Sequence, residues 1–240
     1  MIKELKRIID ESESIVFFGG AGVSTESGIP DFRGANGLYE RDEDDGPSPE
    51  ELLSEGCLRL RPRAFFDYYK SNMIYQYAEP NEAHKYLVEL EKQGKLSAIV
   101  TQNIDGLHQR AGSKNVIEIH GSVHRNYCMT CGKSYTLEHI LDADDIPYCT
   151  CGGIVRPDVV LYSEGLGSAF YEAEDAIFNA DTLIVGGTSL TVHPACTLID
   201  SFQGEHLIII NQTPTPYDGY AEMIIREPIG EVFSELMELE

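Results

Sequence analysis

Four of the six cysteines stand in two close pairs that are separated by 17 residues: Cys128 with Cys131, and Cys149 with Cys151. Thiolates in such pairs bind zinc tetrahedrally, and a set of four leaves no ligand position open for catalysis. The sequence therefore predicts a structural zinc ion. His124 or His139 could replace a displaced cysteine, and unliganded thiols are the alternative to a metal.

A glycine-rich turn follows the apolar run of residues 15–18, which predicts a buried strand. The turn, Gly20-Ala21-Gly22, would let the backbone approach a pyrophosphate, whose charge the N-terminus of a following helix would stabilise. Thr25 stands where the motif G-x-G-x-x-G has its third glycine. The turn alone therefore has two interpretations, a dinucleotide site or a tight structural turn.

Polar residues follow two further apolar runs. His120 comes directly after residues 116–119, and Asn103 and Asp105 come shortly after residues 98–100. Ligands of open α/β sheets bind outside the carboxyl ends of the strands, where these side chains would lie. A neutral imidazole accepts a proton near pH 7, so His120 is a candidate base. Turn or capping chemistry is the alternative role for Asp105.

These residues belong to longer motifs that recur in one order along nearly the whole chain. The types and the order of the motifs given next resemble those of the sirtuin family. The motifs are residues 20–33 (GAGVSTESGIPDFR), residues 101–108 (TQNIDGLH), His120-Gly121, the cysteine pairs, residues 156–160 (RPDVV), residues 187–190 (GTSL) and Asn211. The family has two residues inside its second cysteine pair, and this chain has only Thr150, so the geometry of that loop is an open question.

The resemblance implies an enzyme that consumes NAD to remove acetyl groups from lysine side chains of proteins. Its products would be nicotinamide, deacetylated lysine and O-acetyl-ADP-ribose. The resemblance makes His120 the catalytic base and gives Asn103 a role at the ribose hydroxyls or a bound water. It places the NAD site on Gly20, Ala21, Gly22, Thr25, Ile29, Asp31, Phe32, Arg33, Gln102, Asn103, Ile104, Asp105, His120, Gly187, Thr188, Ser189 and Asn211.

The substrate peptide would lie as an extended strand against Val159, Val160, Leu161 and Val192, as in the family. Members that prefer succinyl or malonyl groups carry a tyrosine and an arginine three positions apart. Here no arginine stands three residues after Tyr68 or Tyr69, so a buried acyl carboxylate would lack its partner. Acetyl or a longer neutral acyl group is predicted. Protein ADP-ribosyl transfer, a dehydrogenase and a non-catalytic NAD or ADP-ribose sensor are the alternatives.

The elements that must position these residues alternate between strand and helix. Strands are predicted at residues 15–18, 98–100, 116–119, 182–185, 207–210 and 223–225, and helices at 2–13, 82–93, 169–179, 194–203 and 229–239. This alternation predicts an α/β fold with a Rossmann-like, mostly parallel sheet. The predicted sheet domain comprises residues 1–34, 81–121 and 158–240. A helical insert, residues 35–80, and a zinc-binding insert, residues 122–157, would form a smaller lobe.

The charge and hydrophobic composition of the chain limit the classes of binding partner that can be expected. The formal net charge of −22 argues against a nucleic-acid surface, because phosphate binding relies on Lys and Arg. It suits basic partners such as lysine-rich tails. No apolar run is long enough to span a membrane, and no signal peptide is recognisable. These features predict a cytoplasmic protein without a membrane partner.

Overall fold

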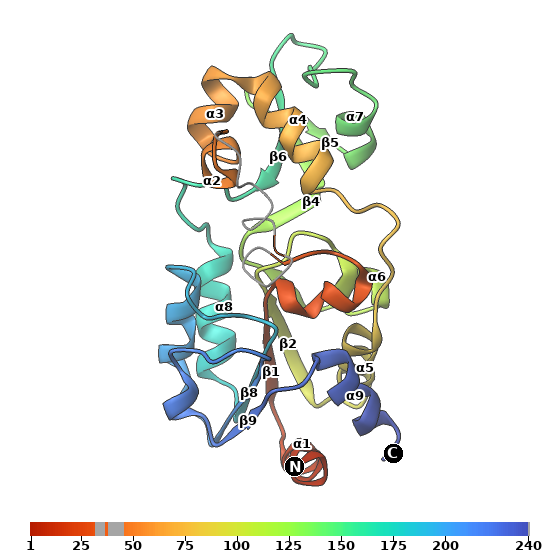
Figure 1. The fold of residues 1–240 in the computed structure, drawn as a ribbon, viewed down its shortest axis with the longest axis vertical. Helices are drawn as coiled ribbons and strands as arrows, with labels where there is room; N and C mark the ends of the chain where they lie inside the picture. The colour runs from red at the N-terminus through yellow and green to blue at the C-terminus, as the bar shows by residue number, and fades with distance from the viewer. Residues whose placement is uncertain (32–36, 38–45, 240) are drawn as a thin grey trace.

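The computed structural model describes residues 1–31, Gly37 and residues 46–239. A large lobe built on a sheet and a smaller lobe lie end to end along the long axis of the molecule, as Figure 1 shows. Both termini belong to the large lobe (Figure 1). The chain crosses between the lobes several times, so the small lobe consists of insertions into the sheet lobe.

The large lobe contains one six-stranded parallel sheet, with the strands in the order β3-β2-β1-β7-β8-β9. The predicted parallel sheet is confirmed, and each predicted strand overlaps an observed one. The observed strands are β1 (Ile15–Gly19), β2 (Leu96–Thr101), β3 (Val116–Glu118), β7 (Thr182–Gly186), β8 (His206–Ile210) and β9 (Met223–Ile225). The order reverses between β1 and β7, the place where a doubly wound sheet opens a crevice for a ligand.

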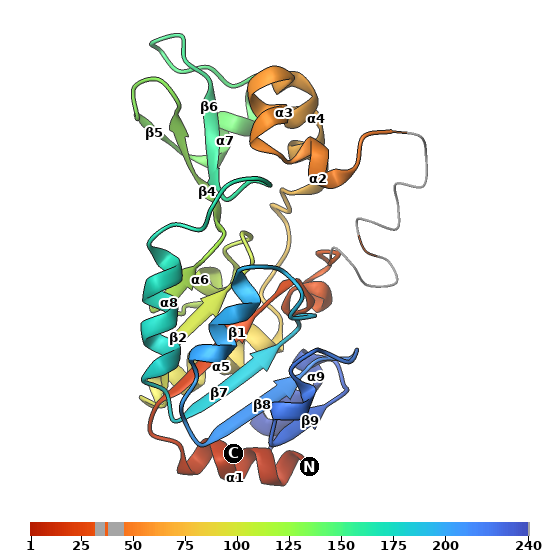
Figure 2. The same cartoon turned by 90° about the vertical axis from the view of Figure 1, so that its left-hand side faces the viewer.

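Alternate residues of each central strand bury opposite faces, because strand side chains alternate with a period of two. In β1, Ile15 and Phe17 pack into one apolar layer, while Val16 and Phe18 pack into the other. Helices α1 (Ile2–Glu11), α5 (Glu82–Lys92) and α9 (Ile229–Met237) cover the first face. Helix α8 (Ala169–Phe178) and the 3₁₀ segment η4 (Ala195–Ser201) cover the second (Figure 2). A short helix, α6 (Leu107–Ala111), follows β2.

One predicted helix differs in type. Residues 194–203 were expected to form an α-helix, but η4 is a 3₁₀ helix. Its ends carry the tighter i to i+3 bonds, from the Thr197 N–H to the Pro194 carbonyl at 2.9 Å and from the Phe202 N–H to the Ile199 carbonyl at 3.1 Å. The apolar spacing still buries Cys196, Leu198 and Ile199, which is why the sequence pattern resembled that of an α-helix.

The small lobe joins segments from both predicted inserts. It contains α2 (Pro49–Leu52), α3 (Glu55–Leu60), α4 (Pro62–Asn72) and α7 (Leu137–Leu141), and an antiparallel sheet of β5 (Ser134–Tyr135), β4 (Gly121–Cys128) and β6 (Val155–Val159). One apolar cluster unites them, with Phe65 and Phe66 of α4 packed in the same group as Val123 and Val155. The fold class is therefore confirmed, while the domain boundaries stay a prediction.

The apolar residues of the predicted zinc-binding insert, residues 122–157, have little regular periodicity, yet β4 and β6 pair from Gly121 with Val159 to Cys128 with Val155. The pairing has an irregularity between Ser122 and Asn126, which interrupts the period-two pattern that a sequence argument needs. Among the helices that the structure describes, none has the length and apolar character needed to cross a bilayer.

Candidate active site

The glycine turn lies at the crevice between β1 and β7. The Gly20 N–H donates to the Gly186 carbonyl at 3.1 Å, and the Gly22 N–H donates to the Gly187 carbonyl at 2.8 Å. A Cβ on Gly20 would come within 2.7 Å of the Thr188 Cβ, and one on Gly22 within 2.8 Å of the Gly187 Cα. Close packing of the two loops thus already requires glycine at both positions, which supports the structural-turn interpretation without removing the ligand one.

The helix expected after the glycine turn is not formed. Two short 3₁₀ turns, η1 (Ala21–Val23) and η2 (Thr25–Ser27), take its place. Gly28 ends the second turn in the left-handed region, with φ 83°, and Pro30 follows it closely. The prediction of a regular helix after the turn is therefore wrong, and a phosphate at this loop would meet the N-termini of short 3₁₀ turns.

A polar cluster lies where the glycine turn meets the loop after β2. The Ser24 hydroxyl donates to Oδ2 of Asp105 at 2.7 Å, and Nδ2 of Asn103 donates to the Ser24 Oγ at 3.1 Å. The Leu107 N–H donates to the Asp105 Oδ1 at 2.8 Å. Burial raises the pKa of Asp105, against the opposing effect of the Leu107 and Ser24 hydrogen bonds. Asn103 and Asp105 are thus brought together as predicted.

Ser24 is the member of this cluster that the sequence analysis did not select. It is 1% exposed and connects the other two side chains. It lies inside the motif GAGVSTES, next to Thr25, which the resemblance places at the NAD site. Thr25 is exposed, and its hydroxyl donates to the Gly22 carbonyl at 3.0 Å within the same loop.

His120 lies between β3 and β4, at the carboxyl edge of the sheet. Its Nδ1 is 2.9 Å from the carbonyl oxygen of Gln102. A carbonyl oxygen only accepts, so Nδ1 carries the proton and the neutral ring keeps its lone pair on Nε2. Burial lowers the pKa of His120, against a smaller opposing effect of the Gln102 carbonyl. The imidazole is therefore neutral near pH 7, as a base requires.

The backbone of His120 also contacts the predicted peptide segment. The Val160 N–H donates to the His120 carbonyl at 2.9 Å. Val159 ends β6 and pairs with Gly121, the residue after His120. Leu161 is buried in the small lobe, whereas Val192 lies half-buried in the loop after β7. The main chain that would pair with a peptide is thus bonded directly to the candidate base.

The residues predicted to bind the rest of NAD lie after strands β2, β7 and β8 of the sheet. Nε2 of Gln102 donates to the buried Thr188 Oγ1 at 3.1 Å, which joins the β2 and β7 edges. Ser189 shares a hydrogen bond of 2.8 Å with the Thr191 hydroxyl. Asn211 follows β8, and its Nδ2 donates to the Thr213 carbonyl at 2.8 Å.

The other residues predicted for the NAD site lie near the polar cluster. Ala21, Ile29, Asp31 and Ile104 are half-buried around the polar cluster's loops. The Ile104 carbonyl accepts from the Val123 N–H at 3.0 Å, which ties this loop to the small lobe. Phe32 and Arg33 lie outside the described residues, so their predicted roles stay predictions.

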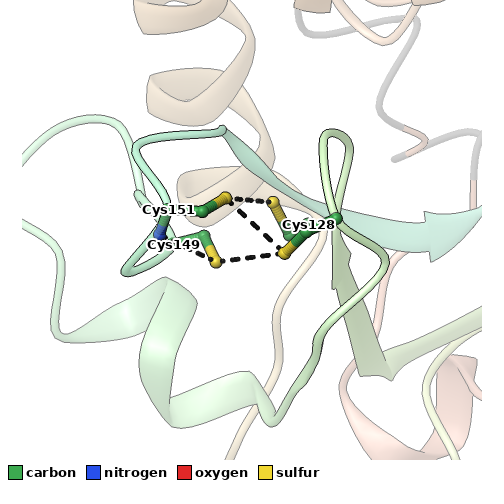
Figure 3. A group of neighbouring side chains, drawn as sticks. Cys128, Cys149 and Cys151 are labelled. Carbon is green, nitrogen blue, oxygen red and sulfur yellow. Dashed lines mark hydrogen bonds between the residues drawn. The ribbon is translucent and has the colours of Figure 1, made fainter.

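The four paired cysteines meet in the small lobe (Figure 3). Their sulfurs all lie within 4.8 Å of one another, and this is the metal-type cluster found among the described residues. The short Cys149-Thr150-Cys151 loop reaches the cluster, with Cys151 Sγ 3.5 Å from both Cys128 Sγ and Cys131 Sγ. The Cys151 N–H lowers the pKa of Cys149 to about 5, which favours a thiolate. The donor set fits a four-thiolate zinc site.

The alternative ligands are engaged elsewhere. His139 Nε2 is 3.1 Å from the Tyr148 carbonyl, and His124 Nε2 is 3.0 Å from the Asp105 carbonyl. The shortened cysteine spacing therefore needs no histidine to complete the set.

A Rossmann-type sheet with polar groups at its switch point and an inserted four-cysteine lobe defines a nucleotide-using class of protein. The model of the Sir2 family matches residues 20–194. The chain belongs to the Sir2 family.

Several known proteins are similar to this chain over almost its full length. The NAD-dependent protein deacetylase of Clostridium acetobutylicum is 56% identical over 239 residues, which is 98% of each chain. That of Clostridium tetani is 54% identical over 239 residues, covering 98% of this chain and 97% of the relative. A structure described as Sir2 with p53 peptide and NAD⁺ superimposes with a TM-score of 0.86 at 37% identity, covering 100% of this chain and 98% of that one. A Sir2 variant with deacetylated p53 peptide and 3′-O-acetyl-ADP-ribose gives a TM-score of 0.90 at 38% identity, covering 99% and 98%.

Proposed function

We propose that this protein is an NAD-dependent protein lysine deacetylase that yields nicotinamide, deacetylated lysine and O-acetyl-ADP-ribose. The observation that carries the proposal is the neutral His120 ring, hydrogen-bonded through Nδ1 and joined through its own carbonyl to the peptide segment. The names of the Clostridium relatives and of the Sir2 complexes support the same reaction.

The residues at the switch point fit NAD by their chemistry. NAD, when bound, supplies the ribose carbon that takes up the acetyl oxygen as nicotinamide leaves. Asp105 accepts one hydrogen bond at each oxygen, and a carboxylate has lone pairs to spare for the NH₂ of a carboxamide. We assign Ser24, Asn103 and Asp105 to the nicotinamide end. The remaining predicted NAD residues keep their assignments, with Ser189 and Asn211 at the adenosine end.

His120 is the base in this proposal. Its Nε2 takes a proton from a ribose hydroxyl, and the Gln102 carbonyl stabilises the imidazolium that results through the Nδ1 proton. A lowered pKa keeps the ring ready to accept at neutral pH. Asn103 is held by the Ser24 hydroxyl at 3.1 Å and so presents a fixed amide to the ribose or to a bound water.

The proposed partner is an acetylated lysine in a protein, held by main-chain pairing to Val159, Val160, Leu161 and Val192. Recognition through backbone requires little sequence from the partner. The positions three residues after Tyr68 and Tyr69 are Ser71 and Asn72, which carry no charge to pair with an acyl carboxylate. Lys70, next to the tyrosines, donates to the carbonyls of Ala143 and Asp145 at 2.5 and 3.1 Å, and Asn72 donates to the Tyr68 carbonyl at 3.0 Å. Acetyl or a neutral longer acyl group is therefore the proposed substrate.

The test is turnover of an acetyl-lysine peptide with and without NAD, followed by mass spectrometry. We expect NAD-dependent loss of acetyl, with equal amounts of nicotinamide and O-acetyl-ADP-ribose. His120→Ala should lower kcat by roughly 10²- to 10⁴-fold, the usual contribution of a general base.

The matched control is His206→Ala. His206 lies at the amino end of β8, away from the carboxyl edge that carries His120, and it pairs with Glu222. It should keep the wild-type rate. Transfer of ADP-ribose to protein with the acetyl group retained would support the transferase alternative. Binding of NAD without any turnover would support the sensor alternative and overturn the proposal.

A further inference from the structure

An ion pair between the buried Arg156 and the half-buried Glu164 brackets the predicted peptide segment. Arg156 lies in β6 and is 6% exposed. Its Nη1 is 2.5 Å from Oε1 of Glu164, and its Nη2 is 2.9 Å from Oε2. This two-point contact fixes the plane of both groups. Buried ion pairs contribute little net stability because of their desolvation cost, so the pair calls for another explanation.

Arg156 Nε donates to the Pro157 carbonyl at 3.1 Å within β6, and the other two bonds of the pair go to the peptide segment itself. Arg156 Nη2 donates to the Val159 carbonyl at 2.9 Å, and the Leu161 N–H donates to Oε2 of Glu164 at 2.9 Å. The two charged groups thus hold the backbone on both sides of Val160. Burial alone would raise the pKa of Glu164, but the bonds from Arg156 and Leu161 hold it below the usual value. The carboxylate is therefore charged when it holds the segment.

Two further contacts complete the attachment. The Val160 N–H reaches the His120 carbonyl at 2.9 Å, and the Tyr162 N–H reaches the Leu53 carbonyl at 3.1 Å. Directly after Tyr162 the chain turns at Ser163, whose φ is 75°, and this turn directs Glu164 back toward Arg156. The segment is thereby tied to the candidate base on one side and to the helical insert on the other.

We propose that Arg156 and Glu164 are positioning residues that hold Val159–Leu161 in the extended form that pairs with the substrate peptide, in register with His120. This inference rests on the proposed deacetylase function. Its consequence is specific: loss of the pair weakens peptide use and leaves NAD use unchanged, because the contacts of the pair lie in β4, in β6 and in the peptide segment, away from the predicted NAD residues.

The test compares Glu164→Gln and Arg156→Lys with wild type by measuring kcat and both KM values in the zinc-loaded protein. We expect the peptide KM to rise about tenfold for Glu164→Gln, since a charged acceptor is lost from two donors. The NAD KM should stay within twofold. Glu164→Asp keeps the charge and should recover part of the loss.

The chain offers a matched control at the nucleotide end. Arg226 pairs with Asp218 and donates to the carbonyls of Asn211 and Thr213 at 2.8 and 3.0 Å. Asp218→Asn should therefore show the opposite pattern, a higher NAD KM with an unchanged peptide KM. The contrast separates positioning from a general loss of an ion pair.

Equal rises of both KM values in Glu164→Gln, or a lower melting temperature with unchanged kinetics, would overturn the inference. If that variant does not fold, the same readouts on Arg156→Lys decide it. A wild-type protein without deacetylase activity overturns the proposed function instead. Affinity for a fluorescent acetyl-lysine peptide, with and without Glu164→Gln, would then decide the inference separately.

Discussion

The large lobe and the small lobe are each stabilised by a different kind of interaction. Among the described residues, 20 buried side chains lie in the apolar layer on one face of the sheet and 17 in the layer on the other. The small lobe has one cluster of 14, and Cys128 and Cys149 of the metal group are among them. A core of this size stabilises a small unit only marginally. The sheet lobe can therefore rely on apolar burial, while the small lobe needs its cysteines.

Because the lobes are stabilised differently, the two halves of the candidate active site are positioned by different interactions. His120, Asn103 and Asp105 follow strands of the sheet lobe. Val159–Leu161 instead lies at the end of β6, whose first residue, Val155, pairs with Cys128 of the metal group. The site thus combines a base held by a rigid sheet with a peptide segment held by the metal-dependent lobe. Perturbations that affect one lobe alone should separate the two contributions.

Metal removal should have the largest effect, and only on the small lobe. Structural zinc contributes roughly 10–16 kcal/mol of apparent binding free energy in small zinc-finger peptides. Cys131→Ser, or chelation, should therefore remove amide protection from β4 and β6 while β1, β7 and β8 keep theirs. Hydrogen exchange with mass spectrometry measures both regions in one sample.

The matched control is Cys57→Ala, because Cys57 is a buried cysteine of the same lobe outside the metal group. It should keep one zinc ion per chain and the protection of β4. Unchanged protection of β4 and β6 in metal-free protein would contradict the comparison of the two lobes.

Acid should act on the sheet lobe through two buried histidines. His84 of α5 and His108 of α6 lie with ring centroids 4.8 Å apart and are 0% and 1% exposed. Burial lowers the pKa of His84 to about 4 and that of His108 well below its ordinary value. Both folded values lie below the unfolded one, so the stability is complete above about pH 6.5 and is lost as the pH falls.

The loss should be roughly 1.4 kcal/mol per pH unit for each histidine. His108→Leu removes one of these histidines from an apolar site. Its free energy of unfolding, measured by urea denaturation, should therefore fall less between pH 7.5 and pH 5 than that of wild type. The expected difference is about 2 kcal/mol over this interval. The exposed His193 supplies the control, since His193→Leu should keep the wild-type acid dependence. An identical pH slope for His108→Leu would exclude the pair as the acid-sensitive element.

The sequence predicted the sheet better than the details of the site. Apolar runs such as residues 15–18 and 207–210 identify buried strands because every residue in them is apolar. Ser24, Arg156 and Glu164 were missed because their importance arises from contacts between segments, for instance between Ser24 and Asp105. The glycine turn had two interpretations in the sequence, because its close packing on Gly187 and Thr188 joins residues far apart in the chain. The cysteine group was predictable, since its spacing is local.

The smallest expected effect concerns the connection that returns from the small lobe to the sheet lobe. Ser163 has a φ of 75°, where a side chain is unfavourable and glycine is not. Ser163→Gly should therefore stabilise the protein by about 0.5–1 kcal/mol, less the weak bond from its hydroxyl to the Tyr162 carbonyl. This corresponds to roughly 1–4 °C in melting temperature. Ser168→Gly is the matched control, because Ser168 has a φ of −60° and should gain nothing from glycine. A lower melting temperature for Ser163→Gly would show that the connection draws its order from the serine itself and not from the Arg156–Glu164 pair.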